Sequence, residues 1–353
     1  MRAARDTFLN PVVSLALCAV AGALFSWLKT PLPWMIGPLL VMAAFNFSGA
    51  RLRAPTGGRQ VGQVIIGTAL GLYFTPVVAR QVVSYWHFLL LAALLAILIA
   101  CACAWFISRV TGTDRTTAFF ASVPGGAAEM AVLAERFGAR VDRVTIAQSM
   151  RILAVVIVIP FVMTYSGVHG ADVYVQATAS LDWGLLVVLL AIAAAGGGLL
   201  TAAGMSNAFM LGALFSVIAL TVNEVHLSAM PPLVSNVGQL LIGCALGGRF
   251  ERTYLDRIPG FVVAVLASIL LAIGLAASMG AGLAWMYGLP IPSVILATAP
   301  GGIAEMCITA KVLQLGVPLV TAAQVTRVLV LVTGTGTLFK WAHAIAVKLR
   351  KSK

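Results

Sequence analysis

Two glutamates stand in the same unusual setting, three residues after a Pro-Gly-Gly sequence within a strongly apolar stretch. Glu129 lies in "PGGAAEM" (124–130) and Glu305 in "PGGIAEM" (300–306). Of the 11 acidic residues in the chain, these two alone lie deep inside apolar segments. A carboxylate within a membrane is costly and marks a candidate site for a proton or a cation. A glutamate at the third helical position can also cap its helix, and the two roles are compatible.

The Pro-Gly-Gly sequences predict a break in each of these helical segments. Proline ends one half-helix, and the glycines let the chain turn and begin a second one, whose free N–H groups form a positive end. In hydrocarbon, a break is tolerated only where protein or a water-filled cavity supplies hydrogen-bond partners. We expect exposed backbone at a binding site, and the alternative is a tightly packed hairpin tip. The glycines concerned are Gly125, Gly126, Gly301 and Gly302.

An arginine follows each break at the same spacing. Arg151 ends "AQSMR" and Arg327 ends "AQVTR", so each arginine stands three residues after a glutamine, Gln148 or Gln324. A buried arginine needs a partner. We favour ion pairs with the two glutamates, with contact to an anionic substrate as the alternative, and we expect the two glutamines to line the same cavity.

A second pair of glutamines, Gln63 and Gln239, lies in glycine-rich segments. The segments read "GQVIIGTALG" (62–71) and "GQLLIGCALG" (238–247). Glycine-rich helices pack closely in membranes, and an amide can hydrogen-bond across such an interface. Packing at a helix interface is therefore the favoured role, and the lining of a polar cavity is the alternative.

These motifs reveal an internal duplication. The glycine-rich segments, the Pro-Gly-Gly sequences and the Gln-x-x-Arg motifs all recur at one constant offset, the one that separates Pro124 from Pro300. "WMIGPL" also resembles "FMLGAL" at an offset that is shorter by a single position. We predict a first membrane repeat at 1–166, an external linker at 167–182, a second membrane repeat at 183–343 and a basic cytoplasmic tail at 344–353.

The distribution of cations predicts how the repeats are oriented. If all twelve apolar segments crossed the membrane, clusters of arginine would lie on both sides, against the positive-inside rule. If the Pro-Gly-Gly segments instead enter and return on one side, nearly all loop cations, including Arg59 and Arg249, become cytoplasmic. Each repeat then has five spans and one re-entrant segment. An odd number of spans makes the two repeats inverted, as in many secondary transporters.

Composition supports the membrane class and argues against others. The chain of 353 residues is 61% hydrophobic and only 10% charged, with a mean hydropathy of +1.01, whereas soluble domains carry about 25% charged residues. The net charge of +12 comes without any DNA-binding motif, so no direct nucleic-acid partner is expected. The 4 histidines and 5 cysteines are scattered, and we predict no metal site, no cofactor and no enzymatic activity.

The duplicated "GQ-x-x-IG-x-ALG", "PGG-x-AEM" and "Q-x-x-R" motifs together resemble the bacterial inner-membrane AbrB family over nearly the whole chain. Members of that family carry labels such as transcriptional regulator or ammonia monooxygenase, and the family is grouped with transporters that use inverted repeats and broken segments. A copper monooxygenase needs clustered histidine ligands, which this sequence does not place together. The resemblance implies a multi-pass protein of the bacterial inner membrane, and the distribution of cations predicts that both termini are cytoplasmic.

The sequence thus predicts an all-α polytopic membrane protein that acts as a secondary transporter of a small polar solute. Its partners would be the lipid bilayer, the solute and a coupling H⁺ or Na⁺, and a homo-oligomer is left open. The alternative is a membrane regulator that affects gene expression indirectly and transports nothing.

Overall fold

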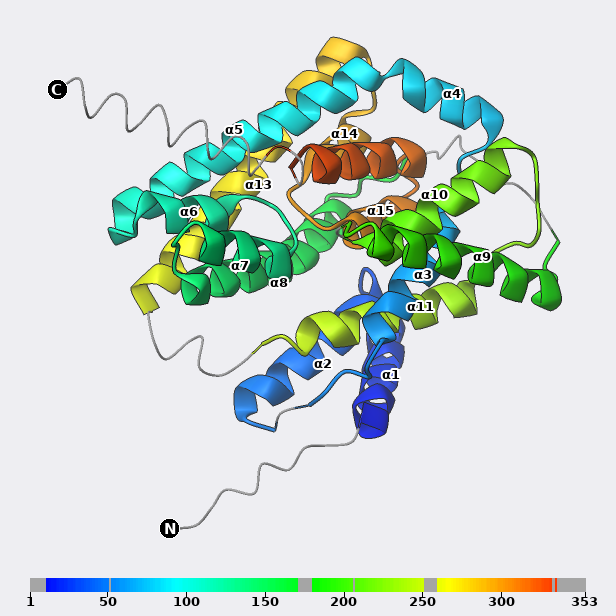
Figure 1. Ribbon diagram of the computed structural model, residues 1–353, viewed down its shortest axis with the longest axis horizontal. Coiled ribbons are helices and arrows are strands. Elements are labelled where there is room, and N and C mark those ends of the chain that lie inside the picture. The colour runs from blue at the N-terminus through cyan, green and yellow to red at the C-terminus, as the bar shows by residue number, and fades with distance from the viewer. Residues whose placement is uncertain are drawn as a thin grey trace, which may run out of the picture.

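The computed structural model describes residues 11–50, 52–170, 180–205, 207–250, 259–331 and 334 (Figure 1). Within these residues the secondary structure is entirely helical. Residues 1–10, most of the predicted linker and the predicted basic tail lie outside the described residues.

Six helices form the first of two groups, which we call the glycine bundle. Three precede the middle of the chain and three follow it, and each half packs its first two helices against each other, α1 on α2 and α9 on α10. The members are α1 (Pro11–Trp27), α2 (Pro33–Ser48), α3 (Gly58–Gly71), α9 (Trp183–Ala202), α10 (Ala208–Val222) and α11 (Pro232–Gly247).

Inside this bundle, helices of one half of the chain pack against helices of the other half. Helix α3 packs on α10 and α11 packs on α2, so each glycine-rich helix contacts the other half. A Cβ on Gly67 would lie 2.7 Å from the Met210 carbonyl oxygen, and one on Gly243 would overlap the Met35 carbonyl oxygen. Because the two glycines are equivalent in the duplication, as are the two methionines, the contacts are reciprocal. The predicted role of the glycine-rich segments in close helix packing is confirmed.

The two broken segments and the helices that pack around them form the second group, which we call the hairpin bundle. Helices α5 and α13 pack along each other, and each also contacts the first half-helix of its own broken segment. The members are α5 (Trp86–Thr111), α6 (Arg115–Ser122), α7 (Ala127–Arg136), α8 (Val141–Tyr165), α13 (Pro259–Tyr287), α14 (Ile291–Thr298), α15 (Ile303–Leu313) and the helix Val317–Leu331. Helix α14 begins and ends at the positions that the duplication makes equivalent to the ends of α6.

One element of the first half departs from the prediction. Helix α4 (Pro76–Ser84) follows α3 at an angle of 92°, whereas the sequence pattern has apolar segments at 60–75 and 86–109 and predicts no element between them. Thr75 precedes this helix and its hydroxyl accepts a hydrogen bond from the Val78 N–H at 3.4 Å. Because Pro76 lacks an N–H and suits the first helical position, the Thr-Pro pair begins a new helix here.

Several helices are long and apolar, which is consistent with a multi-pass membrane protein. Among the described residues, 4 helices are long enough to cross a membrane, or 5 if α3 and α4 count as one bent span. The other apolar helices are shorter: α3 has 14 residues and α1 has 17. At 1.5 Å per residue they measure roughly 21–26 Å, against about 30 Å of hydrocarbon. The expected five spans per repeat therefore stay a prediction.

Candidate functional site

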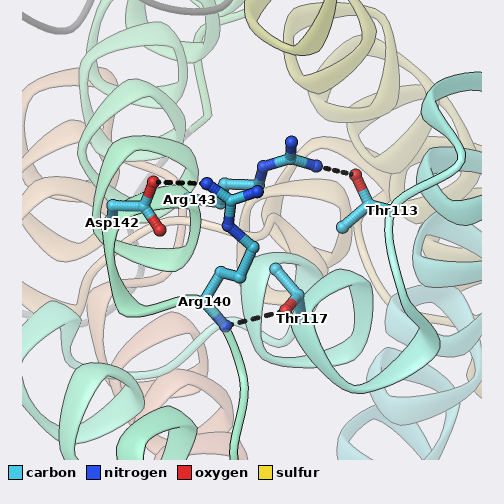
Figure 2. Close-up of polar contacts among 5 residues, drawn as sticks. All are labelled: Thr113, Thr117, Arg140, Asp142 and Arg143. Atoms are coloured by element: carbon cyan, nitrogen blue, oxygen red, sulfur yellow. Dashed lines mark hydrogen bonds and ion pairs between the residues drawn. The ribbon is translucent and has the colours of Figure 1, made fainter.

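The first broken segment is a hairpin whose two ends meet. It consists of α6, an irregular stretch at 123–126 and α7. The Arg140 N–H, after α7, donates to the Thr117 hydroxyl in the first turn of α6 at 2.9 Å, and the Arg143 guanidinium donates to the Thr113 hydroxyl at 2.7 Å (Figure 2). The chain from 113 to 143 therefore goes out and comes back to the same place.

The structure explains why each break contains two glycines. At the first glycine, a Cβ on Gly125 would lie 2.6 Å from the end of the Met130 side chain, and Gly301 has the same relation to Met306 at 2.7 Å. Both methionines are buried, so a Cβ at either glycine would require the methionine side chain to shift. The spacing "PGG-x-AEM", which both halves share, thus lets the methionine of each motif fold back over the break.

The second glycine of each motif makes room for the glutamate. A Cβ on Gly126 would lie 3.2 Å from the Glu129 carboxyl carbon, and one on Gly302 would overlap the Glu305 carboxyl group. Each glutamate is the third residue of its half-helix, and its carboxyl group lies against the glycine that precedes the helix, a position that suits the predicted capping role. Each carboxylate therefore sits at the N-terminal end of the second half-helix, where the helix dipole favours a negative charge.

The Gln-x-x-Arg motifs bind the free carbonyl groups of the breaks. The Gln148 amide donates to the Phe120 and Val123 carbonyls at 2.8 and 2.9 Å. Arg151 donates to the Val123 and Gly125 carbonyls at 3.0 and 3.1 Å. The Phe120 carbonyl lies in the last turn of α6, where the helix supplies no partner, and the other two lie in the irregular stretch of the break.

The second half repeats this arrangement. The Gln324 amide donates to the carbonyls of Leu296, Ala297 and Ala299 at 3.1 to 3.2 Å. Arg327 donates to the carbonyls of Ala299 and Gly301.

The expected ion pairs are not what the structure shows. In the described part of the chain, Arg151 and Arg327 hydrogen-bond to main-chain carbonyls and neither lies within ion-pair distance of Glu129 or Glu305. The physical reason is the break itself: two half-helices that end in a buried place leave carbonyl oxygens that need strong donors. Both arginines are structural partners of the backbone.

A cavity of about 100 Å³ lies where the two hairpin tips face the glycine bundle. It brings together most of the predicted site residues. From the hairpins these are Gly125, Gly126, Gly301, Gly302, Glu305, Arg151 and Arg327, and from the glycine bundle Gln63.

Four predicted residues are placed elsewhere. Gln148 and Gln324 are fully buried behind the breaks, and Gln239 is half-buried on α11 and does not line the cavity. Glu129 does not line it either, but its charge acts on Arg59, which does.

Sequence reasoning missed three polar residues of the cavity: Arg59, Asn207 and Arg249. Arg59 and Gln63 both donate to the Asn207 side-chain oxygen, at 3.4 and 3.3 Å. The positive-inside rule predicts a cytoplasmic position for Arg59 and Arg249 but says nothing of a site, and the structure places both on the cavity wall. The spacing of Arg59 and Gln63, one helical turn apart on α3, was a signal that they share a face.

No group of three or more potential metal ligands occurs among the described residues. The site is therefore built from guanidinium groups, carboxylates, amides and exposed main chain.

Long apolar helices, two broken segments and a buried polar cavity between two bundles make a helical protein that is consistent with the multi-pass membrane class. The family model described as "Transition state regulatory protein AbrB" matches residues 34–343, and the chain belongs to this family. It is 26% identical to "Uncharacterized protein YhjN" of Bacillus subtilis (strain 168) over 96% of this chain and 94% of that protein. It is 24% identical to "Putative regulator AbrB" of Escherichia coli (strain K12) over 92% of this chain and 95% of that protein.

Proposed function

We propose that this chain is a secondary transporter of a small polar solute that binds between the hairpin tips and the glycine bundle. The observation that carries the proposal is the cavity itself, which contains a buried glutamate and the open backbone of both broken segments. Broken segments whose half-helix ends face a central site are the usual means by which secondary transporters bind solute and coupling ions.

Each group of residues has a role in this proposal. Glu129 and Glu305 take up the coupling H⁺ or Na⁺ beside the half-helix N-termini. The four glycines of the breaks let the solute approach the main chain closely, because they carry no side chain. Four side chains hold the tips in shape, because they donate hydrogen bonds to the main-chain carbonyls of the breaks: Gln148, Gln324, Arg151 and Arg327.

Alternating access would follow from movement of the hairpin bundle against the glycine bundle. Reciprocal contacts of the two halves, such as Gly67 with Met210 and Gly243 with Met35, support a related pair of repeats. The out-and-back path of residues 113–143 supports a re-entrant segment. With inverted repeats in the bacterial inner membrane, one hairpin would then enter from each side.

Flux across a bilayer tests the proposal. The purified protein is reconstituted into liposomes that contain a pH-sensitive dye, and small solutes are added outside with and without a sodium gradient. We expect solute-dependent movement of H⁺ or Na⁺, lost in the Glu129→Gln/Glu305→Gln variant and retained in Glu224→Gln, whose glutamate is exposed in a loop. A double variant that transports normally would refute the coupling role.

A second candidate is a membrane regulator that affects gene expression indirectly and transports nothing. The name of the Escherichia coli relative, "Putative regulator AbrB", favours it. The two candidates differ in one respect: a change in transcript levels caused by transport disappears in the Glu129→Gln/Glu305→Gln variant, whereas a change produced without transport persists.

A further inference from the structure

We propose that the cavity binds a small organic carboxylate, whose anionic group is held by Arg59 and Arg249. This names the class of solute for the proposed transporter. It rests on the proposed function only for the statement that the bound anion is also transported.

The first argument is the charge of the cavity. Four guanidinium groups line it, those of Arg59, Arg151, Arg249 and Arg327. The carboxylates that act on them are Glu305, which lines the cavity, and Glu129 beside it. The excess is two positive charges when both glutamates are ionised and four when both are protonated. In either state the cavity favours an anionic solute over a cationic one.

The second argument is which of these arginines has donors to spare. Arg151 and Arg327 are engaged with main-chain carbonyls. Arg59 makes one long hydrogen bond of 3.4 Å to a neutral amide oxygen, and Arg249 makes none in the described part of the chain. The charge that acts most strongly on Arg249 is that of Arg59. Two half-buried like charges facing one cavity are satisfied by an anion between them.

The third argument comes from the duplication. The arginines that hold the breaks occur in both halves, at 151 and 327, as expected of a role that each break requires. In the alignment of the halves that pairs Pro124 with Pro300, Arg59 corresponds to Ser235 and Arg249 to Tyr73. The fold of the repeat therefore does not require an arginine at either place. The role of this arginine pair differs from that of the two arginines that hold the breaks.

The fourth argument is the size and lining of the cavity. About 100 Å³ is smaller than the cavity of about 150 Å³ that holds benzene in a protein core. Apolar side chains cover the rest of its wall, among them Ile152, Val155, Ile242, Leu246 and Val328. A short-chain monocarboxylate has both parts that this site requires, an anionic head for the arginines and a small apolar body.

Binding to the purified full-length protein in a non-ionic detergent tests the site without transport. The probes are propionate, its neutral counterpart propionamide, its cationic counterpart propylammonium and inorganic phosphate, each titrated at constant ionic strength while the melting temperature is followed. Because a ligand that binds the folded state raises the melting temperature with concentration, each titration yields an apparent affinity.

We expect propionate to stabilise the protein and propionamide and propylammonium not to do so. Arg59→Gln and Arg249→Gln should each weaken propionate binding about tenfold or more, since each loses a charge-assisted hydrogen bond. The matched control is Arg80→Gln, which removes one positive charge from the exposed face of α4 and should bind propionate like the parent chain. A variant that fails to fold is replaced by Arg59→Lys or Arg249→Lys, for which we expect a smaller loss.

Three results would overturn the proposal: stabilisation by propylammonium, stabilisation by phosphate without any by propionate, and unchanged propionate affinity in both arginine variants. The failure of the proposed function looks different. Propionate that binds through Arg59 and Arg249 but does not cross a liposome membrane would refute transport and leave the anion site standing. Flux of a cationic solute such as propylammonium, dependent on Glu129 and Glu305 and without any flux of propionate, would refute the anion site and leave transport standing.

Discussion

The guanidinium of Arg151 donates one hydrogen bond to the Val123 carbonyl at 3.0 Å and another to the Gly125 carbonyl at 3.1 Å, on either side of Pro124. One side chain thus bridges the break that the proline creates. Arg327 does the same for the carbonyls on either side of Pro300. The two broken segments share this support, which fixes the shape of the tips that border the cavity.

Loss of this bridge should destabilise the fold. Arg151→Met leaves the Gly125 carbonyl without its donor, at a cost of about 1–3 kcal/mol, while the Val123 carbonyl keeps the Gln148 amide. The melting temperature in detergent should therefore fall. Arg151→Lys keeps the charge but lacks the planar fork, so we expect an intermediate fall. The control Arg80→Met, on the exposed face of α4, should melt like the parent chain, and equal melting temperatures for Arg151→Met and the parent would contradict the bridging role.

The contact of Gly67 with the Met210 main chain predicts a specific intolerance. A methyl group at residue 67 would lie 2.7 Å from a carbonyl oxygen, so α3 and α10 would have to separate, and overpacking of this kind costs about 1–3 kcal/mol. Gly67→Ala should therefore lower the melting temperature. Gly198→Ala is the matched control on α9, where nothing lies within 4 Å of the added methyl. That change should be neutral or stabilising, by up to about 1 kcal/mol, and a stabilised Gly67→Ala would refute the reciprocal packing.

The second glycine of each hairpin predicts an asymmetry between the halves. A methyl group on Gly302 would overlap the Glu305 carboxyl, whereas one on Gly126 would only touch the Glu129 carboxyl carbon at 3.2 Å. In the liposome flux assay, Gly302→Ala should reduce transport more than Gly126→Ala does. The clash should also lower the melting temperature of Gly302→Ala. In the Gly302→Ala/Glu305→Ala variant the clash is gone but the carboxylate is missing, so the melting temperature should recover and the flux should not. If the melting temperature of the double variant did not recover, the methyl group on residue 302 would clash with a group other than the Glu305 carboxyl.

The hydrogen bond that joins the two ends of the first hairpin predicts a local change in dynamics when it is removed. The Thr117 hydroxyl, fully buried, accepts the hydrogen bond of the Arg140 N–H (Figure 2). Thr117→Val removes that acceptor, so α6 and the start of α8 should separate more often, and amide exchange should rise in residues 123–140 but not in α13. Thr116→Val, at a half-buried neighbour, is the control. Equal amide exchange of residues 123–140 in Thr117→Val and Thr116→Val would show that this hydrogen bond does not hold the hairpin together.

Much of the helical plan could be predicted from the duplication. The breaks at 123–126 and 299–302, and the close packing of the glycine-rich helices, follow from local rules for proline and glycine, and each pattern occurs twice at the same offset in the chain. The bend into α4 was missed because a Thr-Pro pair at the end of an apolar run can also mark the start of a loop.

The polar site was harder to predict because it is made by contacts between the halves. Arg59 has the sequence surroundings of a loop cation, and only the packing of α3 on α10 brings it beside Asn207. The pairing of Arg151 with a glutamate was a reasonable expectation from charge alone. It failed because carbonyl oxygens, which every residue carries, leave no mark in a sequence pattern even where a break exposes them.

The most direct test of the account is whether the two hairpins enter the membrane from opposite sides. In a chain whose native cysteines are replaced by alanine, one cysteine is placed at the end of each hairpin, by Glu135→Cys after the first break or by Val312→Cys after the second. Both positions are exposed. Intact cells are then treated with a membrane-impermeant thiol reagent, before and after permeabilisation. We predict labelling of the Val312→Cys chain in intact cells and of the Glu135→Cys chain only after permeabilisation. Labelling of both chains from the same side would contradict inverted repeats and the transport mechanism built on them.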